Sequence, residues 1–205
     1  MQKVILALLG IFLVGCGVSF NAMAQFGNDS IGIVYDGVRS FANLSQEQLG
    51  YVSNFLNGGL IILLWFIGRR YINIGTVIYI LPYGIFVDIG TAIYSAVFSG
   101  SGFFGRALAT TIGCLILYIG VAIFITMDIG LDPFTGLVMA ICDMVNKEYS
   151  KVKVIFDFCM IGLGFVLGGK LGVITIITAL TAGPGIQFFA EKVKKICVSK
   201  GIVEL

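Results

Sequence analysis

Residues 104–133 read FGRALATTIGCLILYIGVAIFITMDIGLDP, and this stretch decides how the chain folds. Its first 24 residues carry a single charged side chain, Arg106. About 20 apolar residues are enough for a helix to cross the hydrocarbon core of a bilayer. The run leads into Asp132-Pro133, where aspartate suits the cap of a helix and proline suits its first position. The stretch therefore predicts a membrane-spanning helix, a turn and the start of a second helix.

Apolar runs of similar length recur along the whole chain. They lie at about residues 4–24, 49–68, 73–98, 104–127, 152–169 and 172–190. Hydrophobic residues make up 58% of the 205 residues and charged residues 12%, whereas soluble domains carry about 25% charged residues. We therefore predict an all-α membrane protein, with one transmembrane domain over residues 1–205 and about six transmembrane helices.

Two further segments, at about 30–43 and 133–146, are too short to cross a bilayer. The apolar residues of each fall on one helical face, with polar residues elsewhere. Asp29-Ser30 and Asp132 precede them as candidate N-caps. Such helices either lie in the membrane interface or re-enter the membrane as half-helices, and the sequence leaves both alternatives open.

The N-terminus allows three interpretations. Lys3 precedes an apolar run, and Ala22-Met23-Ala24 resembles the cleavage site of a signal peptide. Leu13-Val14-Gly15-Cys16 resembles a bacterial lipobox. The third interpretation is a retained first helix. We favour it, because the rest of the chain also spans the membrane and because residues 17–29 have counterparts later in the sequence.

The basic residues indicate the orientation of the chain. With a cytoplasmic N-terminus and six spans, ten of the 13 lysines and arginines fall on cytoplasmic segments. Only Arg39, Arg106 and Lys170 fall on the outer side. Because cytoplasmic loops are enriched in basic residues, this distribution predicts that the N- and C-termini are both cytoplasmic.

The two halves of the chain resemble each other at an offset of about 100 residues. The matched pairs are Gly17 with Gly120, Gly27 with Gly130, Asp29 with Asp132, Asn57 with Asp157, Gly84 with Gly183 and Asp88 with Gln187. Each repeat contains an odd number of spans, three, so the second copy enters the membrane from the opposite side. We predict two inverted three-helix repeats, at about 4–98 and 104–192, an arrangement common in secondary transporters.

The turns that carry these matches resemble those of the bacterial YczE/YyaS/YitT family of membrane proteins. The shared motifs are Ile129-Gly130-Leu131-Asp132-Pro133, Ile74-Gly75-Thr76 and Gly183-Pro184. The chain departs from the pattern at Gly27-Asn28-Asp29-Ser30, which lacks the proline, and at Thr135, where an acidic residue is common. The resemblance implies a multi-pass protein of the bacterial plasma membrane, often described as permease-like, with no established substrate class.

Six polar residues are candidates for binding a solute or an ion. They are Asp88, Asp157, Asn57, Gln187, Asp29 and Asp132. A carboxylate inside a bilayer is retained only if it is protonated, paired or facing a polar cavity. Each acid also has a structural interpretation: Asp88 bonded to neighbouring helices near the interface, Asp157 paired with Lys153 four residues before it, and Asp29 and Asp132 as helix caps.

The function predicted from these features is transport of an unknown small solute, coupled to protons or cations, by a protein surrounded by the lipid bilayer and assembled as a homodimer. The alternative is a non-transporting accessory protein that helps to assemble or regulate a partner. We do not expect an enzyme, because the chain has no histidine and no nucleophile–base pair. Its five cysteines lack metal-site spacing, so no metal or cofactor is expected. A net charge of +2 gives no indication of a nucleic-acid partner.

Overall fold

The computed structural model describes residues 2–147 and 149–203, and these residues form α-helices, two short 3-10 helices and no strand. The α-helices are α1 (Gln2–Ala24), α2 (Gly32–Phe41), α3 (Leu49–Ile67), α4 (Ile74–Phe98), α5 (Phe103–Thr126), α6 (Pro133–Val145), α7 (Tyr149–Val166) and α8 (Val173–Ser199). The 3-10 helices are η1 (Gln46–Gln48) and η2 (Arg69–Tyr71). The all-α prediction is confirmed, and the two short segments form α2 and α6.

Five helices of the described chain are long and apolar enough to cross a membrane. They are α1, α3 together with η1, α4, α5 and α8. The sixth predicted span coincides with α7, which is 18 residues long. Three charged residues, Lys151, Lys153 and Asp157, lie within it. These charged residues distinguish α7 from the five helices named above.

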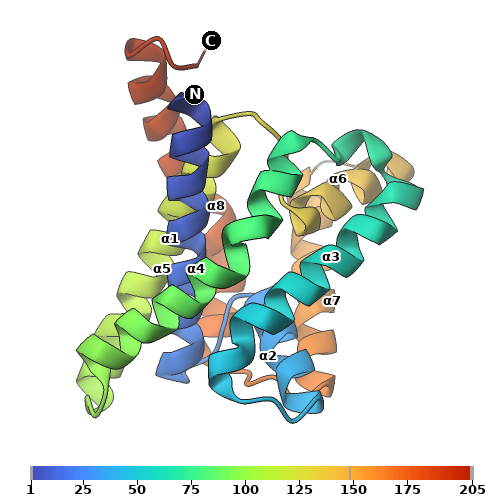
Figure 1. The fold of residues 1–205 in the computed structure, drawn as a ribbon. Coiled ribbons are helices and arrows are strands. Elements are labelled where there is room, and N and C mark those ends of the chain that lie inside the picture. The colour runs from blue at the N-terminus through green and yellow to red at the C-terminus, as the bar shows by residue number, and fades with distance from the viewer. Residues whose placement is uncertain (1, 148, 204–205) are drawn as a thin grey trace.

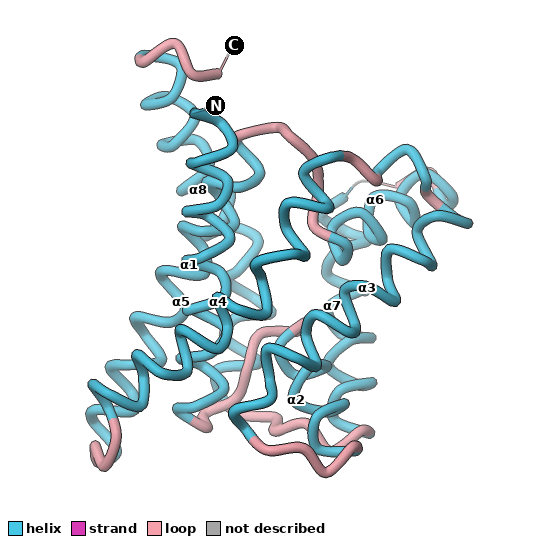
Figure 2. The backbone as a smooth tube through the Cα atoms, in the orientation of Figure 1, coloured by secondary structure: helices cyan, strands magenta, loops and turns pink. Residues whose placement is uncertain are grey.

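The long helices alternate in direction along the chain. In Figure 1, α1 runs away from the end of the molecule where both termini lie, α3 returns towards it, and α4, α5, α7 and α8 continue the alternation. The short helix α2 lies between α1 and α3 at the far end, and α6 lies between α5 and α7 at the end that holds the termini. Short loops, drawn pink in Figure 2, connect the helices.

The helices pack in two groups. In the first group α1 contacts α4 and α5, and α5 contacts α8. In the second group α2 contacts α3 and α7, and α6 contacts the same two helices. Contacts of α3 with α4 and of α7 with α8 join the groups. The space between them is therefore bounded by helices from both halves of the chain.

Glycines bring α1 and α5 into backbone contact. A Cβ atom added to Gly10 would lie 2.8 Å from the carbonyl oxygen of Gly120, and one added to Gly120 would lie 2.7 Å from the carbonyl oxygen of Gly10. A Cβ atom on Gly17 would lie 2.7 Å from the carbonyl oxygen of Gly113. Small residues allow helices in a membrane to approach this closely, so these glycines set the distance between α1 and α5.

A proline interrupts the hydrogen bonding of α4. Pro82 lies inside the helix and has no N–H to donate. Two residues later, the Gly84 N–H donates to Asn54 Oδ1 of α3 at 2.9 Å. Asn54 therefore attaches α3 to the interrupted turn. Inside a membrane, side chains of neighbouring helices commonly satisfy backbone groups at such a proline.

Candidate functional site between the short helices

The first turn of α6 is built as the sequence predicts. The Asp132 carboxylate accepts the Thr135 N–H at 3.0 Å, and Pro133 occupies the first helical position. This cap satisfies one of the backbone donors that a helix leaves free at its N-terminus. It also fixes Phe134, the next residue, at the point where α6 meets α2.

The first turn of α2 is capped by Asp29, one of the two predicted capping residues. The α-helix begins at Gly32, and the Asp29 backbone carbonyl accepts the Ile33 N–H at 2.9 Å. The Asp29 carboxylate accepts the Ile31 N–H at 3.3 Å, as the side chain of a capping residue does. The Ser30 hydroxyl donates to Asp157 of α7 at 2.6 Å. Asp29 thus caps the first turn, and Ser30 joins it to α7.

Asp157 lies in a buried polar cluster between α2 and α7. It accepts hydrogen bonds from Ser30 and from the Lys153 ammonium group one turn earlier. The predicted Lys153–Asp157 pair is confirmed, and the exposed fractions of its side chains are 23% and 8%. Asp29 lies within electrostatic range of both Lys153 and Asp157. One ammonium group therefore faces two carboxyl groups.

Asn57, the counterpart of Asp157 in the first half, is fully buried on α3. Its Oδ1 accepts the Tyr35 hydroxyl of α2 at 3.2 Å. Its Nδ2 has no hydrogen-bond partner among the described residues. A buried donor without a partner is costly, so this amide is a group that a bound solute could satisfy.

Aromatic rings fill the space between the two groups of helices. Tyr79 and Tyr83 of α4 stack with their ring centroids 4.9 Å apart. The Tyr35 ring lies 6.2 Å from Tyr83 and 5.8 Å from Phe134 of α6. Both Asp29 and Asp132 lie within electrostatic range of Tyr35. No prediction from the sequence included these tyrosines, although the spacing of four residues between Tyr79 and Tyr83 on an otherwise apolar helix was a usable signal.

Two of the predicted site residues lie away from this centre. Asp88 is exposed on α4, and its carboxylate lies against Gly50 at the start of α3, where a Cβ atom added to Gly50 would overlap Asp88 Oδ1. Gln187 is exposed on α8 and donates to Glu191 at 3.2 Å. The structure therefore gathers Asp29, Asp132, Asn57 and Asp157 around the short helices. It does not bring Asp88 or Gln187 to them.

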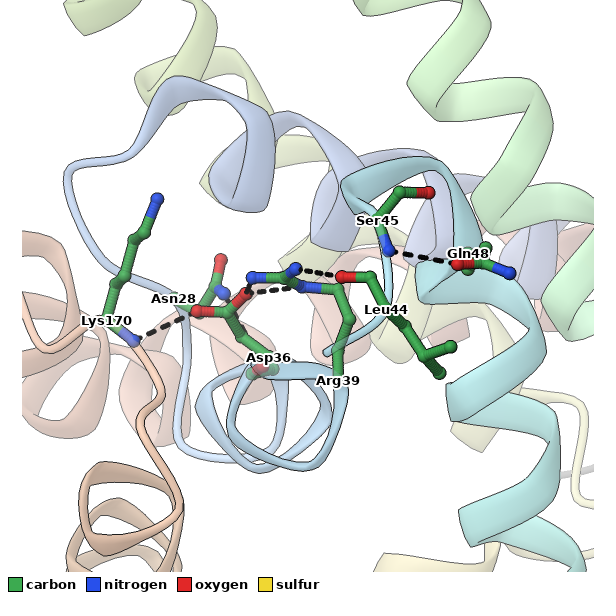
Figure 3. Close-up of polar contacts among 8 residues, drawn as sticks. Asn28, Asp36, Arg39, Leu44, Ser45, Gln48 and Lys170 are labelled. Atoms are coloured by element: carbon green, nitrogen blue, oxygen red, sulfur yellow. Dashed lines mark hydrogen bonds and ion pairs between the residues drawn. The ribbon is translucent and has the colours of Figure 1, made fainter. Parts of the chain in front are cut away.

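A second buried polar network, also missed by the sequence analysis, holds the end of α2 (Figure 3). Asp36 is 2% exposed, and its Oδ1 accepts Arg39 Nε at 3.0 Å and Nη2 at 2.8 Å. Its Oδ2 accepts the Lys170 N–H at 2.9 Å, and Arg39 Nη1 donates to the Leu44 carbonyl at 2.7 Å. Both the Nε side and the far end of the Arg39 guanidinium are thus bonded within this network.

Residues 1–191 match the model of DUF6198, a family of unknown function. The chain belongs to the DUF6198 family. This member is 24% identical over 195 residues to an uncharacterized protein of Haemophilus influenzae, a match that covers 95% of the chain and 86% of the relative. It is 23% identical over 120 residues to the uncharacterized membrane protein YczE of Bacillus subtilis, a match that covers 58% of the chain and 54% of the relative. The resemblance to the YczE-like family is confirmed. No solved structure matches.

Surface hollows lie at both ends of the DUF6198 protein. One, of about 310 Å³, lies at the end of α3 and is lined by Arg69, Arg70 and Asp143 among others. The other, of about 280 Å³, lies where α4 meets α5 and is lined by Tyr94 and Arg106 among others. The aromatic centre lies between the two ends.

Proposed function

We propose that this DUF6198 protein is a small permease of the bacterial plasma membrane, built from two inverted three-helix repeats, that moves a small solute by alternating access. Reciprocal packing between the halves carries the proposal. Adding 103 to the residue number converts Gly10 into Gly113 and Gly17 into Gly120. If every residue is exchanged for the residue 103 positions away in the other half, the Gly10–Gly120 contact becomes the Gly113–Gly17 contact, which the structure also contains. An exchange of this kind is what a two-fold axis between α1 and α5 produces.

The turns before α4 and α8 support the same symmetry. The Gly75 N–H donates to the Ile129 carbonyl at 3.0 Å, and the Ile174 N–H donates to the Phe26 carbonyl at 3.1 Å. Each bond joins the first turn of the last long helix of one repeat to the connection that follows the first helix of the other. The contacts between helices follow the same two-fold symmetry. Within the repeats, α1 packs on α4, and its counterpart α5 packs on α8. Between the repeats, α2 packs on α7, and its counterpart α6 packs on α3.

Topology favours six crossings. Both termini lie at one end of the molecule (Figure 1), which requires an even number, and α7 is the sixth crossing. Its Lys153–Asp157 pair faces α2, where each charge has a partner. The distribution of basic residues supports a cytoplasmic position for both termini. The homodimer stays a prediction from the sequence.

The proposed substrate site lies between the repeats, at the first turns of α2 and α6. Helix N-termini present free N–H groups, and transporters use them to hold charged groups near the middle of the membrane. Asp29, Asp157 and the amide of Asn57 add groups that bind a cation or a proton together with a polar solute. In this proposal the aromatic rings separate the site from the hollows at both ends, and the arrangement is the occluded state of the transport cycle.

Flux through proteoliposomes tests the proposal. The purified protein is reconstituted, and currents are recorded on a solid-supported membrane after jumps in amino acids, sugars, organic anions or monovalent cations, with and without a pH gradient. We expect one class of solute to give a current, and we expect Asp29→Asn to lower this current about tenfold or more. A tenfold change corresponds to a loss of about 1.4 kcal/mol in the free energy of binding at the site. Asp88→Asn is the matched control, because it neutralises an exposed acid. Absence of current for every class would contradict the proposal.

The tightly packed aromatic centre favours a second candidate function. A protein without a permanent passage between its ends also suits an accessory role in assembling or regulating a membrane partner. Purification in a mild detergent distinguishes the two candidates. One partner recovered in fixed stoichiometry, together with no current from the protein alone, would favour the accessory role.

A further inference from the structure

The end of α3 carries aromatic and basic residues side by side. Trp65 and Phe66 are 50% and 80% exposed, and Arg69, Arg70 and Tyr71 follow in η2. Tryptophan and tyrosine gather where a membrane meets water. This segment therefore lies at the level of the lipid headgroups, on the side of the molecule that holds both chain ends (Figure 1).

The hollow of about 310 Å³ at this end combines an apolar wall with a charged rim. Phe66 and Met144 form part of the wall, and Arg69, Arg70 and Asp143 belong to the rim. Its volume lies at the lower end of the range of ligand pockets. A ligand that suits both surfaces has an anionic head joined to an apolar body.

The charges of the rim leave a net positive charge. Arg70 forms an ion pair with Asp143, which also accepts the Tyr71 hydroxyl. The Arg69 guanidinium lies 4.0 Å from the centroid of the Trp65 ring, and no carboxylate of the described residues pairs with it. A guanidinium whose carbon lies over an indole ring keeps N–H groups available, and these match the geometry of a phosphate group.

We propose that this hollow binds the phosphate group of an anionic phospholipid from the leaflet on the side of the chain ends. Arg69 and Arg70 hold the phosphate, and the wall formed by Phe66 and Met144 receives the first part of the acyl chains. Free phosphate offers the same charge but gains nothing from the apolar wall, so the lipid is the favoured source. Asp143 competes with the lipid for Arg70.

The fluorescence of Trp65 tests this proposal directly, because Trp65 is the only tryptophan of the chain and lies against Arg69. The full chain is reconstituted into vesicles of phosphatidylcholine with increasing fractions of phosphatidylglycerol that carries brominated acyl chains. The same series with brominated phosphatidylcholine gives the reference for non-selective contact. We expect brominated phosphatidylglycerol to reach half-maximal quenching at a lower lipid fraction than brominated phosphatidylcholine does. The difference is about fivefold for each arginine that binds the lipid.

Variants separate binding at this hollow from general attraction to a charged surface. Arg70→Gln lowers the preference about fivefold and Arg69→Gln/Arg70→Gln abolishes it, whereas Lys194→Gln on the exposed end of α8 leaves it unchanged. Asp143→Asn frees Arg70 and increases the preference. Equal quenching by the two lipids in the native protein would overturn the proposal, as would an undiminished preference in the double variant. Loss of the preference on adding millimolar inorganic phosphate at constant ionic strength would assign the hollow to soluble phosphate instead.

Discussion

Asp143 shows how single charged residues join elements at the edge of this protein. The hydrogen bond from Tyr71, together with the Arg70 guanidinium, lowers the pKa of Asp143 below its ordinary value of 3.8. A carboxyl group whose pKa is lower in the folded chain stabilises the fold above its unfolded pKa and loses this effect as the pH falls through its folded pKa. We expect Asp143→Asn to lower the thermal unfolding midpoint at pH 7 and the difference to shrink as the pH falls below 3.8. An undiminished difference in strongly acidic buffer would contradict this account.

The buried pair between Lys153 and Asp157 gives a second prediction at this scale. Removing one partner leaves the other charge buried and unpaired, which costs more than removing both. We expect Asp157→Asn to lower the free energy of unfolding by about 2 kcal/mol, and Lys153→Met added to it to restore part of the loss. Titration with a denaturing detergent measures Asp157→Asn, Lys153→Met and the double variant. Additive losses would show that the two side chains do not stabilise each other.

Among the contacts of Asp157 and Asp36, only the pair of Asp157 with Lys153 was predictable from the sequence. The separation of the partners along the chain explains this difference. Lys153 and Asp157 are four residues apart on one helix, so their contact follows from helical geometry alone. The bond from Ser30 to Asp157 spans 127 positions, and the bond from Lys170 to Asp36 spans 134. Such contacts depend on how the helices pack, which composition and spacing do not encode.

At the scale of helices, the contact between α1 and α5 predicts which glycines tolerate substitution. A Cβ atom on Gly17 would meet the backbone of Gly113, whereas one on Gly58 of α3 would meet nothing within 4 Å. Backbone atoms cannot move aside as a flexible side chain does, so a larger residue forces the helices apart. We expect Gly17→Leu to lower the free energy of unfolding by about 2 kcal/mol and so to lower the thermal unfolding midpoint by several degrees. Gly58→Leu, the matched control, keeps the native midpoint.

The six predicted spans agree with the six longest helices of the described chain to within a few residues, except that α8 continues beyond the predicted end at about residue 190 to Ser199. Hydropathy is a local property, so helix positions follow directly from it. The partner of Ser30 does not, because the Ser30 hydroxyl, predicted as part of the α2 cap, bonds to Asp157 of α7. Asp88 shows the same limit: its position inside an apolar run left open a binding site or a contact with a neighbouring helix, and the structure leaves it exposed beside Gly50 of α3.

For the whole molecule, the number of crossings depends on α7. An 18-residue helix rises about 27 Å at 1.5 Å per residue, close to the roughly 30 Å of the hydrocarbon core. The cost of its charges is offset inside the protein, where Lys153 and Asp157 are paired. If α7 instead lay on the surface, five crossings would remain and the two chain ends would lie on opposite sides of the membrane.

Labelling of single cysteines in a cysteine-free variant decides between five and six crossings. With six, Gln2→Cys and Lys200→Cys react with a membrane-impermeant maleimide only after the cells are permeabilised, whereas Ser101→Cys in the loop between α4 and α5 reacts in intact cells. The contrast follows because α1 begins and α8 ends at the same side of the molecule and the loop lies at the other (Figure 1). If Gln2→Cys and Lys200→Cys label from different sides, α7 does not cross. The halves would then not be inverted copies, and the exchange of glycine contacts between α1 and α5 would have no two-fold axis behind it.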